Sequence, residues 1–171
     1  IEPNLALMYH RNVKVIDIFA ARLVLEAAGA SMSFLVLSLF FSYIGLINPP
    51  EDIGKAVFAW FLLAWFGASL AILMGSLSER SEMIDKIWHP TSYLLFPLSG
   101  AAFTVDVLPT AARDLILMLP MVHGIELLRE GYFGSTFKAH YDVAYMAAFC
   151  AVLTLLGLAE TRIISRTVTP E

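Results

Sequence analysis

The stretch that decides the fold is AVFAWFLLAWFGASLAILMGSLS, residues 56–78, a run without a single ionisable side chain. A helix needs about 20 mostly apolar residues to cross a bilayer, and a charged residue near its centre costs at least ~2.5 kcal/mol. Residues 56–78 therefore predict a membrane-spanning helix. The rest of the chain agrees, because 58% of all residues are hydrophobic, against roughly 45–50% in soluble domains.

Three further stretches on either side of this run predict spans, at residues 23–47, 88–105 and 142–160. The first follows Arg22, which lies one helical turn before Glu26 and can pair with it. Within residues 88–105, Pro97 predicts a kink. The last span is short and needs polar flanks near the interfaces to cover ~30 Å of hydrocarbon. We therefore expect an all-α fold, a polytopic transmembrane helical bundle, with residues 1–171 forming a single domain.

Residues 109–131, between the last two predicted spans, read as two short helices over about 109–119 and 121–131. The apolar run within them, residues 115–125, is too short to cross and is interrupted by Pro120. Each helix begins with proline near its first turn, where proline is favoured, and the second ends at a glycine. A run of this kind suits a re-entrant segment, whose irregular backbone is buried in protein.

Basic residues give the expected orientation, because cytoplasmic loops are enriched in lysine and arginine. With four spans, the segments on one side of the membrane hold Arg11, Lys14, Arg22, Arg80, Lys86, Arg162 and Arg166. The other side holds Lys55, Arg113, Arg129 and Lys138. The bias predicts cytoplasmic termini and external re-entrant helices.

Composition and motifs exclude several classes of function. The net charge of −4 and the absence of a basic run argue against binding to nucleic acid. Cys150 has no second cysteine with which to form a disulfide or a thiolate metal site. No Walker A loop, HExxH or GxSxG motif is found, so ATP-driven work would need a partner. The opening IEPNLALMYH lacks an initiator methionine, and we expect a fragment that begins within a longer protein.

Aromatic residues in the middle spans are candidates for a translocation canal, since flat rings can stack on the apolar faces of sugars. The candidates are Trp60, Tyr93, Phe96 and Phe103, the last three of which flank Pro97. Aromatic residues also fill cores and anchor helices at the interface, and this alternative stays open.

The second short helix carries four polar candidates: His123, Glu126, Arg129 and Glu130. The i,i+3 spacing allows Glu126 to pair with Arg129. At membrane depth, ionisable groups are costly and tend to mark function. In the external headgroup layer, the same residues would form an ordinary solvated ion pair. His123 alone does not decide between packing, pore lining and contact with a substrate.

Residues 1–22, before the first predicted span, mix charged and apolar side chains. The candidate residues here are Tyr9, His10, Arg11, Asn12, Lys14 and Asp17. Such a segment suits either a juxtamembrane helix on anionic lipid or a docking surface for a cytoplasmic subunit.

Four pieces of the chain together resemble permease subunits of capsular-polysaccharide ABC exporters, within the type-2 ABC exporter superfamily. They are YHRNVKVIDIFAARLVLE, SERSEMIDKIWHPTSYLLFPLSGAAF, VLPTAARDLILMLPMVHGIELLREGYFG and GLAETR. The resemblance implies a homodimer of six-span permeases with two cytoplasmic subunits that bind ATP and magnesium, and no cofactor in this chain. It further implies that residues 8–17 form a coupling helix, that residues 109–131 are the external re-entrant helices, and that an amino-terminal helix and two spans are missing here.

The resemblance implies a non-catalytic subunit in the bacterial inner membrane that exports an acidic or lipid-linked capsular polysaccharide. Membrane lipid and periplasmic and outer-membrane export proteins are the further expected partners. Exporters of O-antigen, teichoic acid, lipids or drugs are the nearest alternatives. Two alternatives come from other classes of protein. The first is a membrane-embedded glycan-processing enzyme, which would need a catalytic acid/base pair at membrane depth. The second is a secondary transporter, which usually carries an ion-coupling carboxylate and inverted repeats.

Overall fold

The computed structural model describes residues 15–168, without the side chains of residues 15, 135 and 166–168. Three long helices are α2 (Val15–Tyr43), α3 (Ile53–Arg80) and α7 (Val143–Val168), and three shorter ones are α4 (Glu82–Leu98), α5 (Thr110–Ile116) and α6 (Pro120–Phe133). Short 3-10 turns are η2 (Val105–Val107) and η3 (Gly134–Thr136). The described residues contain no strand, so the predicted all-α fold is confirmed.

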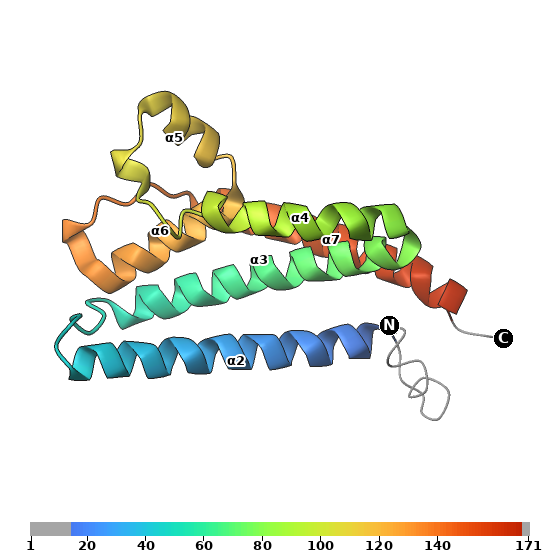
Figure 1. The fold of residues 1–171 in the computed structure, drawn as a ribbon, viewed down its shortest axis with the longest axis horizontal. Helices are drawn as coiled ribbons and strands as arrows, with labels where there is room; N and C mark the ends of the chain where they lie inside the picture. The colour runs from blue at the N-terminus through green and yellow to red at the C-terminus, as the bar shows by residue number, and fades with distance from the viewer. Residues whose placement is uncertain (1–14, 169–171) are drawn as a thin grey trace.

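Three of these helices are long and apolar enough to cross a membrane: Ile16–Tyr43 in α2, Ile53–Arg80 in α3 and Val143–Ser165 in α7. The beginning of α2 and the end of α7 lie at the same end of the bundle (Figure 1). The first and last described helix ends therefore share one end of the bundle, and the cytoplasmic placement of the termini stays a prediction. The two helix ends joined by residues 44–52 lie at the opposite end (Figure 1).

Helix α3 is the centre of the bundle and packs most extensively against α7 and α6. Its Ala59 and Leu62 form the core with Leu127 of α6 and with Met146 and Cys150 of α7. Cys150 is free and fully buried, so it contributes to the packing of this core.

Helices α3 and α7 approach closely where α7 carries a glycine. A Cβ atom at Gly157 would lie 3.0 Å from the backbone nitrogen of Leu73. One turn further along α7, Thr161 and Ser76 of α3 share a buried hydrogen bond of 2.7 Å. Small residues and hydroxyl pairs of this kind are common where membrane helices pack.

Helix α6 runs antiparallel along the first half of α3. Gly131 lies against Ala56, where an added Cβ would be 2.6 Å from the backbone nitrogen, and Gly124 lies against the side chain of Leu63. Leu63 is about 15 Å along α3 from its start at 1.5 Å per residue. Helix α6 therefore reaches roughly half-way along a helix long enough to span a bilayer.

Two short helices lie where residues 109–119 and 121–131 predict them, with altered bounds. Helix α5 covers only Thr110–Ile116 and stands off from the long helices, whereas α6 extends two residues beyond the predicted glycine (Figure 1). Pro120 occupies the first turn of α6, as expected, because its missing N–H is not needed there.

The predicted third span, residues 88–105, is wrong at both ends. Helix α4 starts at Glu82, where acidic residues in the first turn favour the helix N-terminus, and ends at Leu98. The chain turns just after it because Gly100 adopts a φ of +85°, in the left-handed region. The 17 residues of α4 cover about 25 Å, which is short of ~30 Å of hydrocarbon.

The bounds of the first predicted span, residues 23–47, also shift. Helix α2 already begins at Val15 and continues without interruption into the apolar stretch. It ends at Tyr43 and is followed by Gly45, with a φ of +74°. No described residue of α2 is fully buried, so this helix is the least enclosed of the three long ones.

Candidate functional site

The predicted canal aromatics lie on separate parts of the fold. Trp60 faces α2, where its ring stacks on Phe34 at 5.2 Å between centroids and its Nε1–H donates to Ser31 Oγ at 3.0 Å. Trp60 thus joins α3 to α2. Among the described residues, no ring contact links Trp60 to the other three predicted aromatics.

The other three predicted aromatics surround the end of α4. Tyr93 and Phe96 are 80% and 70% exposed on this helix, which has no fully buried residue. Phe103 follows in the loop and is half-buried. Large exposed aromatic rings on a weakly covered helix mark a surface that can meet lipid, another chain or a passing ligand.

An apolar cavity between α2 and α6 was not predicted from the sequence. Its volume is about 280 Å³, and its lining includes four aromatic residues, namely Phe34, Phe41, Tyr132 and Phe133. Phe34 and Phe41 are seven residues apart, so they share one face of α2. That spacing is the only sequence signal for the cavity, since the partners on α6 are far away along the chain.

The carboxylate of Glu126 on α6 is the most deeply buried charged group described, with no exposed surface. It accepts the backbone N–H of Val105 at 3.5 Å and that of His140 at 3.2 Å. Arg129 Nη1 donates to the same side chain at 3.2 Å. The expected Glu126–Arg129 pair is therefore present, and its interpretation as a solvated ion pair is wrong because Glu126 is buried.

Arg129 extends this network to the loop after α4. Its guanidinium donates to the backbone oxygens of Phe103 at 2.6 Å and Ala101 at 2.9 Å. These carbonyls lie in a non-helical segment and have no helical partner. Backbone acceptors outside helices need hydrogen-bond donors from elsewhere, and Arg129 supplies them here.

His123 plays the matching role for the segment before α7. Its Nδ1 accepts the backbone N–H of Asp142 at 2.8 Å, so its Nε2–H is the donor to the Leu117 oxygen, also at 2.8 Å. The ring packs edge-on against Tyr145 at 5.1 Å. His123, Glu126 and Arg129 together form what we call the α6 polar network, which holds the loops on both sides of this helix.

Glu130, the fourth candidate on this helix, faces α3 instead. Its carboxylate lies 3.2 Å from Lys55 Nζ, near the start of α3. The pair lies where the end of α6 meets the beginning of the central helix. It links the two helices and does not belong to the α6 polar network.

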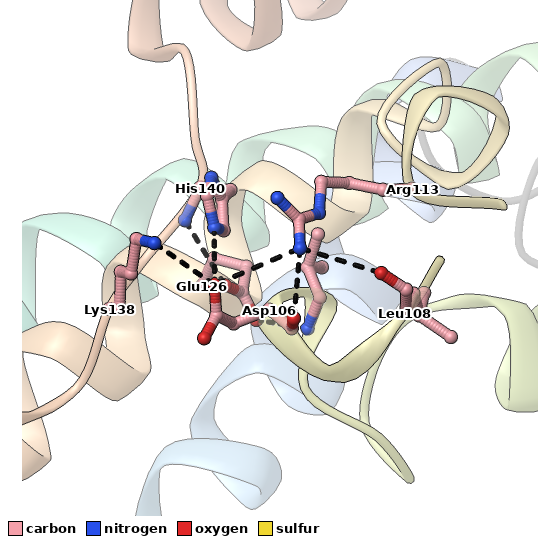
Figure 2. Close-up of polar contacts among 7 residues, drawn as sticks. Asp106, Leu108, Arg113, Glu126, Lys138 and His140 are labelled. Carbon is pink, nitrogen blue, oxygen red and sulfur yellow. Dashed lines mark hydrogen bonds and ion pairs between the residues drawn. The ribbon is translucent and has the colours of Figure 1, made fainter. Parts of the chain in front are cut away.

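A second polar cluster lies on the surface around Asp106 and was not predicted. Asp106 Oδ1 is 3.0 Å from His140 Nε2, 3.6 Å from Lys138 Nζ and 3.8 Å from Arg113 Nη2 (Figure 2). The four residues come from η2, α5 and the segment after η3. The hydrogen bond from His140 lowers the pKa of the Asp106 carboxyl, and the charges of Lys138 and Arg113 lower it further. We call these four residues the Asp106 cluster.

Most of the predicted coupling residues fall outside the described part of the chain: Tyr9, His10, Arg11, Asn12 and Lys14. Asp17 lies in the first turn of α2, where a carboxylate interacts favourably with the helix dipole. Within residues 15–168, no group of three histidine, cysteine or acidic side chains is arranged to hold a metal ion.

The sequence profile of the ABC-2 type transporter family matches residues 3–133, which include α2 to α6. The chain belongs to this family. The matched region contains both the central helix α3 and the α6 polar network. It ends just before η3, so α7 lies beyond it.

Individual relatives of this ABC-2 family chain extend the similarity over α7. It is 37% identical over 171 residues to the capsule polysaccharide export inner-membrane protein BexB of Haemophilus influenzae, and 39% identical over 171 residues to CtrC of Neisseria meningitidis, which bears the same description. The polysialic acid transport protein KpsM of Escherichia coli is 25% identical over 162 residues, or 95% of this chain and 63% of its own length. All of this chain aligns with BexB and CtrC, but it spans only 64% of their length.

Proposed function

We propose that this chain is the membrane-spanning permease part of an ABC exporter that carries capsular polysaccharide across the bacterial inner membrane. One observation carries the proposal: the whole chain aligns, at 37% and 39% identity, with two capsule polysaccharide export inner-membrane proteins. The three long apolar helices supply the membrane-embedded body that such a protein needs.

In this proposal α5 and α6 are the external re-entrant helices. The support is geometric, since α6 lies against Ala56 at one end and reaches Leu63 of the central span at the other. The loops around α6 are irregular, and the α6 polar network satisfies their backbone groups. This is the condition under which non-helical backbone is stable at membrane depth.

The energy comes from two cytoplasmic ATP-binding subunits, because this sequence has no Walker A loop of its own. Residues 1–22 are the proposed coupling segment, which docks on these subunits. Helix α2 runs without a break from Val15 into the membrane span. A displacement of the docked segment would therefore move the span as a rigid body.

The polymer path is proposed to follow the surface of α4, where Tyr93 and Phe96 are exposed, and to lie beside a second copy of the permease. The least covered helices, α2 and α4, present large apolar side chains that lipid, absent spans or the second copy would cover. A moving polymer requires weak and repeated contacts, which exposed aromatic rings provide. Trp60 is engaged with α2 and fits this role less well.

The proposed cargo is an acidic or lipid-linked polysaccharide, passed on to periplasmic and outer-membrane export proteins. The similarity to a polysialic acid transport protein supports an acidic polymer. A membrane-embedded glycan-processing enzyme is disfavoured by the geometry of Glu126. This carboxylate is fully buried and already accepts hydrogen bonds from Val105, His140 and Arg129, so it is not poised as a catalytic acid or base.

The direct test is deletion of the complete gene in its own capsulated host, followed by complementation. We expect surface capsule to disappear and polysaccharide to accumulate in the cytoplasm, and we expect the intact gene to restore export. Labelling of polysaccharide in intact and permeabilised cells separates these two pools. Normal surface capsule in the deletion strain would contradict the proposed function.

A further inference from the structure

The Asp106 cluster has an excess of positively charged groups. Arg113 and Lys138 are basic side chains, and His140 adds a third cationic group when protonated, whereas Asp106 supplies the only carboxylate among the four. All three basic side chains lie within 3.0–3.8 Å of the same carboxylate oxygen, Oδ1 (Figure 2). The charge of the cluster is therefore positive even with a neutral imidazole.

The Asp106 carboxyl responds to these neighbouring positive groups. Its pKa is lowered first by the hydrogen bond from His140 and then by the charges of Lys138 and Arg113. The same charges attract any other anion that reaches the surface.

The basic groups differ in how firmly they are held. Arg113 Nη2 donates to the backbone oxygens of Asp106 at 2.8 Å and Leu108 at 3.4 Å, and its side chain is 24% exposed. His140 is similarly shielded. Lys138 is 74% exposed and lies 3.6 Å from Asp106. Such a surface pair contributes roughly 0–1 kcal/mol, so Lys138 can exchange this partner for another anion at little cost.

We propose that the Asp106 cluster binds acidic groups of the exported polymer, carboxylates or phosphates on sugar residues, with Lys138 as the exchangeable contact. The inference rests on the proposed export function. Asp106 holds the cationic groups together when no polymer is present, and an acidic sugar takes its place on Lys138. The contact is weak, which suits a polymer that must move on.

A sugar polymer fits this surface better than a lipid headgroup does. None of the four residues belongs to the three helices that are able to cross a membrane. They lie on η2, on the short helix α5 and on the loop after η3, and α5 stands off from the long helices (Figure 1). The cluster is therefore not part of a spanning helix that lipid would surround.

The test measures binding of acidic sugars to the complete exporter in lipid nanodiscs. The probes are a fluorescent sialic acid oligomer and a neutral dextran oligomer of the same length. The variant is Lys138→Glu, with Lys138→Gln as a milder second change. Lys86→Glu is the matched control, because Lys86 is 77% exposed and lies 3.4 Å from Glu82 in α4, away from the cluster.

We expect Lys138→Glu to weaken binding of the acidic oligomer about fivefold or more, as removal and reversal of one surface charge predicts. Lys138→Gln should have a smaller effect in the same direction, and both changes should flatten the salt dependence. Lys86→Glu should leave binding unchanged. Unchanged affinity in both Lys138 variants, or displacement of the oligomer by phosphatidylglycerol vesicles, would overturn the inference.

The gene deletion separates this inference from the function on which it rests. If deletion abolishes capsule export and the Lys138 variants still bind the acidic oligomer normally, the cluster is not a polymer site and the export function stands. If deletion leaves capsule export intact, both the function and the inference are overturned.

Discussion

At the scale of single residues, Glu126 shows what the sequence could and could not predict. The i,i+3 spacing was enough to predict its pair with Arg129, because helical geometry alone brings these side chains together. The hydrogen bonds from Val105 and His140 could not be foreseen, because they come from loops whose paths depend on tertiary packing. The same limit applies to the Asp106 cluster, which joins three segments that are separate in the sequence.

Glu126→Ala should strongly destabilise the protein. The change leaves two backbone N–H groups and the Arg129 guanidinium without their buried acceptor. Breaking a buried pair of this kind costs roughly 3–5 kcal/mol. Thermal unfolding of the full-length protein in mild detergent, followed by tryptophan fluorescence, measures the effect. Glu82→Ala is the control, since Glu82 is 92% exposed and forms a surface pair. Equal melting temperatures for the two variants would contradict this account.

The contribution of the Asp106 carboxylate to stability should decrease as the pH falls. The pKa of Asp106 is lower in the folded protein than its usual value of 3.8. Its contribution to stability is therefore fully present above 3.8 and is lost as the pH falls through the folded pKa. Hydrogen exchange of the loop around Asp106 should be faster in Asp106→Asn than in the wild type at pH 5, and equally fast well below pH 3.8. If the exchange rates of the variant and the wild type still differ in strong acid, Asp106 stabilises the loop by something other than its charge.

At the scale of elements, the bounds of a predicted span agree with the observed helix where an uninterrupted apolar run determines them. Residues 56–78 lie wholly within α3, whose start is extended to Ile53 by Asp52, which caps the helix by accepting the N–H of Lys55 at 2.9 Å. Hydrophobicity alone did not predict where α4 begins and ends. The helix includes a polar first turn and stops at Leu98, although the sequence stays apolar up to residue 105. The turn at Gly100, and not a change in polarity, ends it.

The close approach of α6 to α3 predicts opposite effects for two glycine substitutions. Gly131→Ala places a methyl group 2.6 Å from the backbone nitrogen of Ala56, which cannot move aside as a side chain can. Overpacking of this kind costs roughly 1–3 kcal/mol. Gly67→Ala meets nothing within 4 Å and should be neutral or stabilising, by up to about 1 kcal/mol, since alanine favours helices. Melting temperatures of the two variants that change in the same direction would contradict the proposed packing.

The exposed face of α4 predicts a defect in export without a defect in folding. Tyr93→Ala combined with Phe96→Ala removes two exposed rings and no buried contact within this chain, so the packing of the described helices should be unchanged. Surface capsule should decrease several-fold if the rings contact the polymer, because one well-placed aromatic contact contributes about 1 kcal/mol. Phe61→Ala, a change at a 67% exposed ring on α3, is the control. Normal capsule in the double variant would refute the role of these rings.

At the scale of the whole molecule, the family and the general fold were predictable because they depend on composition and on short motifs spread along the chain. The ABC-2 family match over residues 3–133 confirms the resemblance. The bounds of the third predicted span were less predictable. Helix α4 covers Glu82–Leu98, whereas the sequence predicts a span over residues 88–105, and the chain turns at Gly100 within that range.

The central claim is that this chain works as the permease of an ATP-driven exporter. The most direct measurement is quantitative mass spectrometry of the proteins that co-purify with the tagged full-length protein from native membranes in mild detergent. The account predicts a P-loop ATPase subunit in an amount equal to the permease. Reproducible absence of such a subunit, with the permease intact and folded, would remove the energy source and contradict the account.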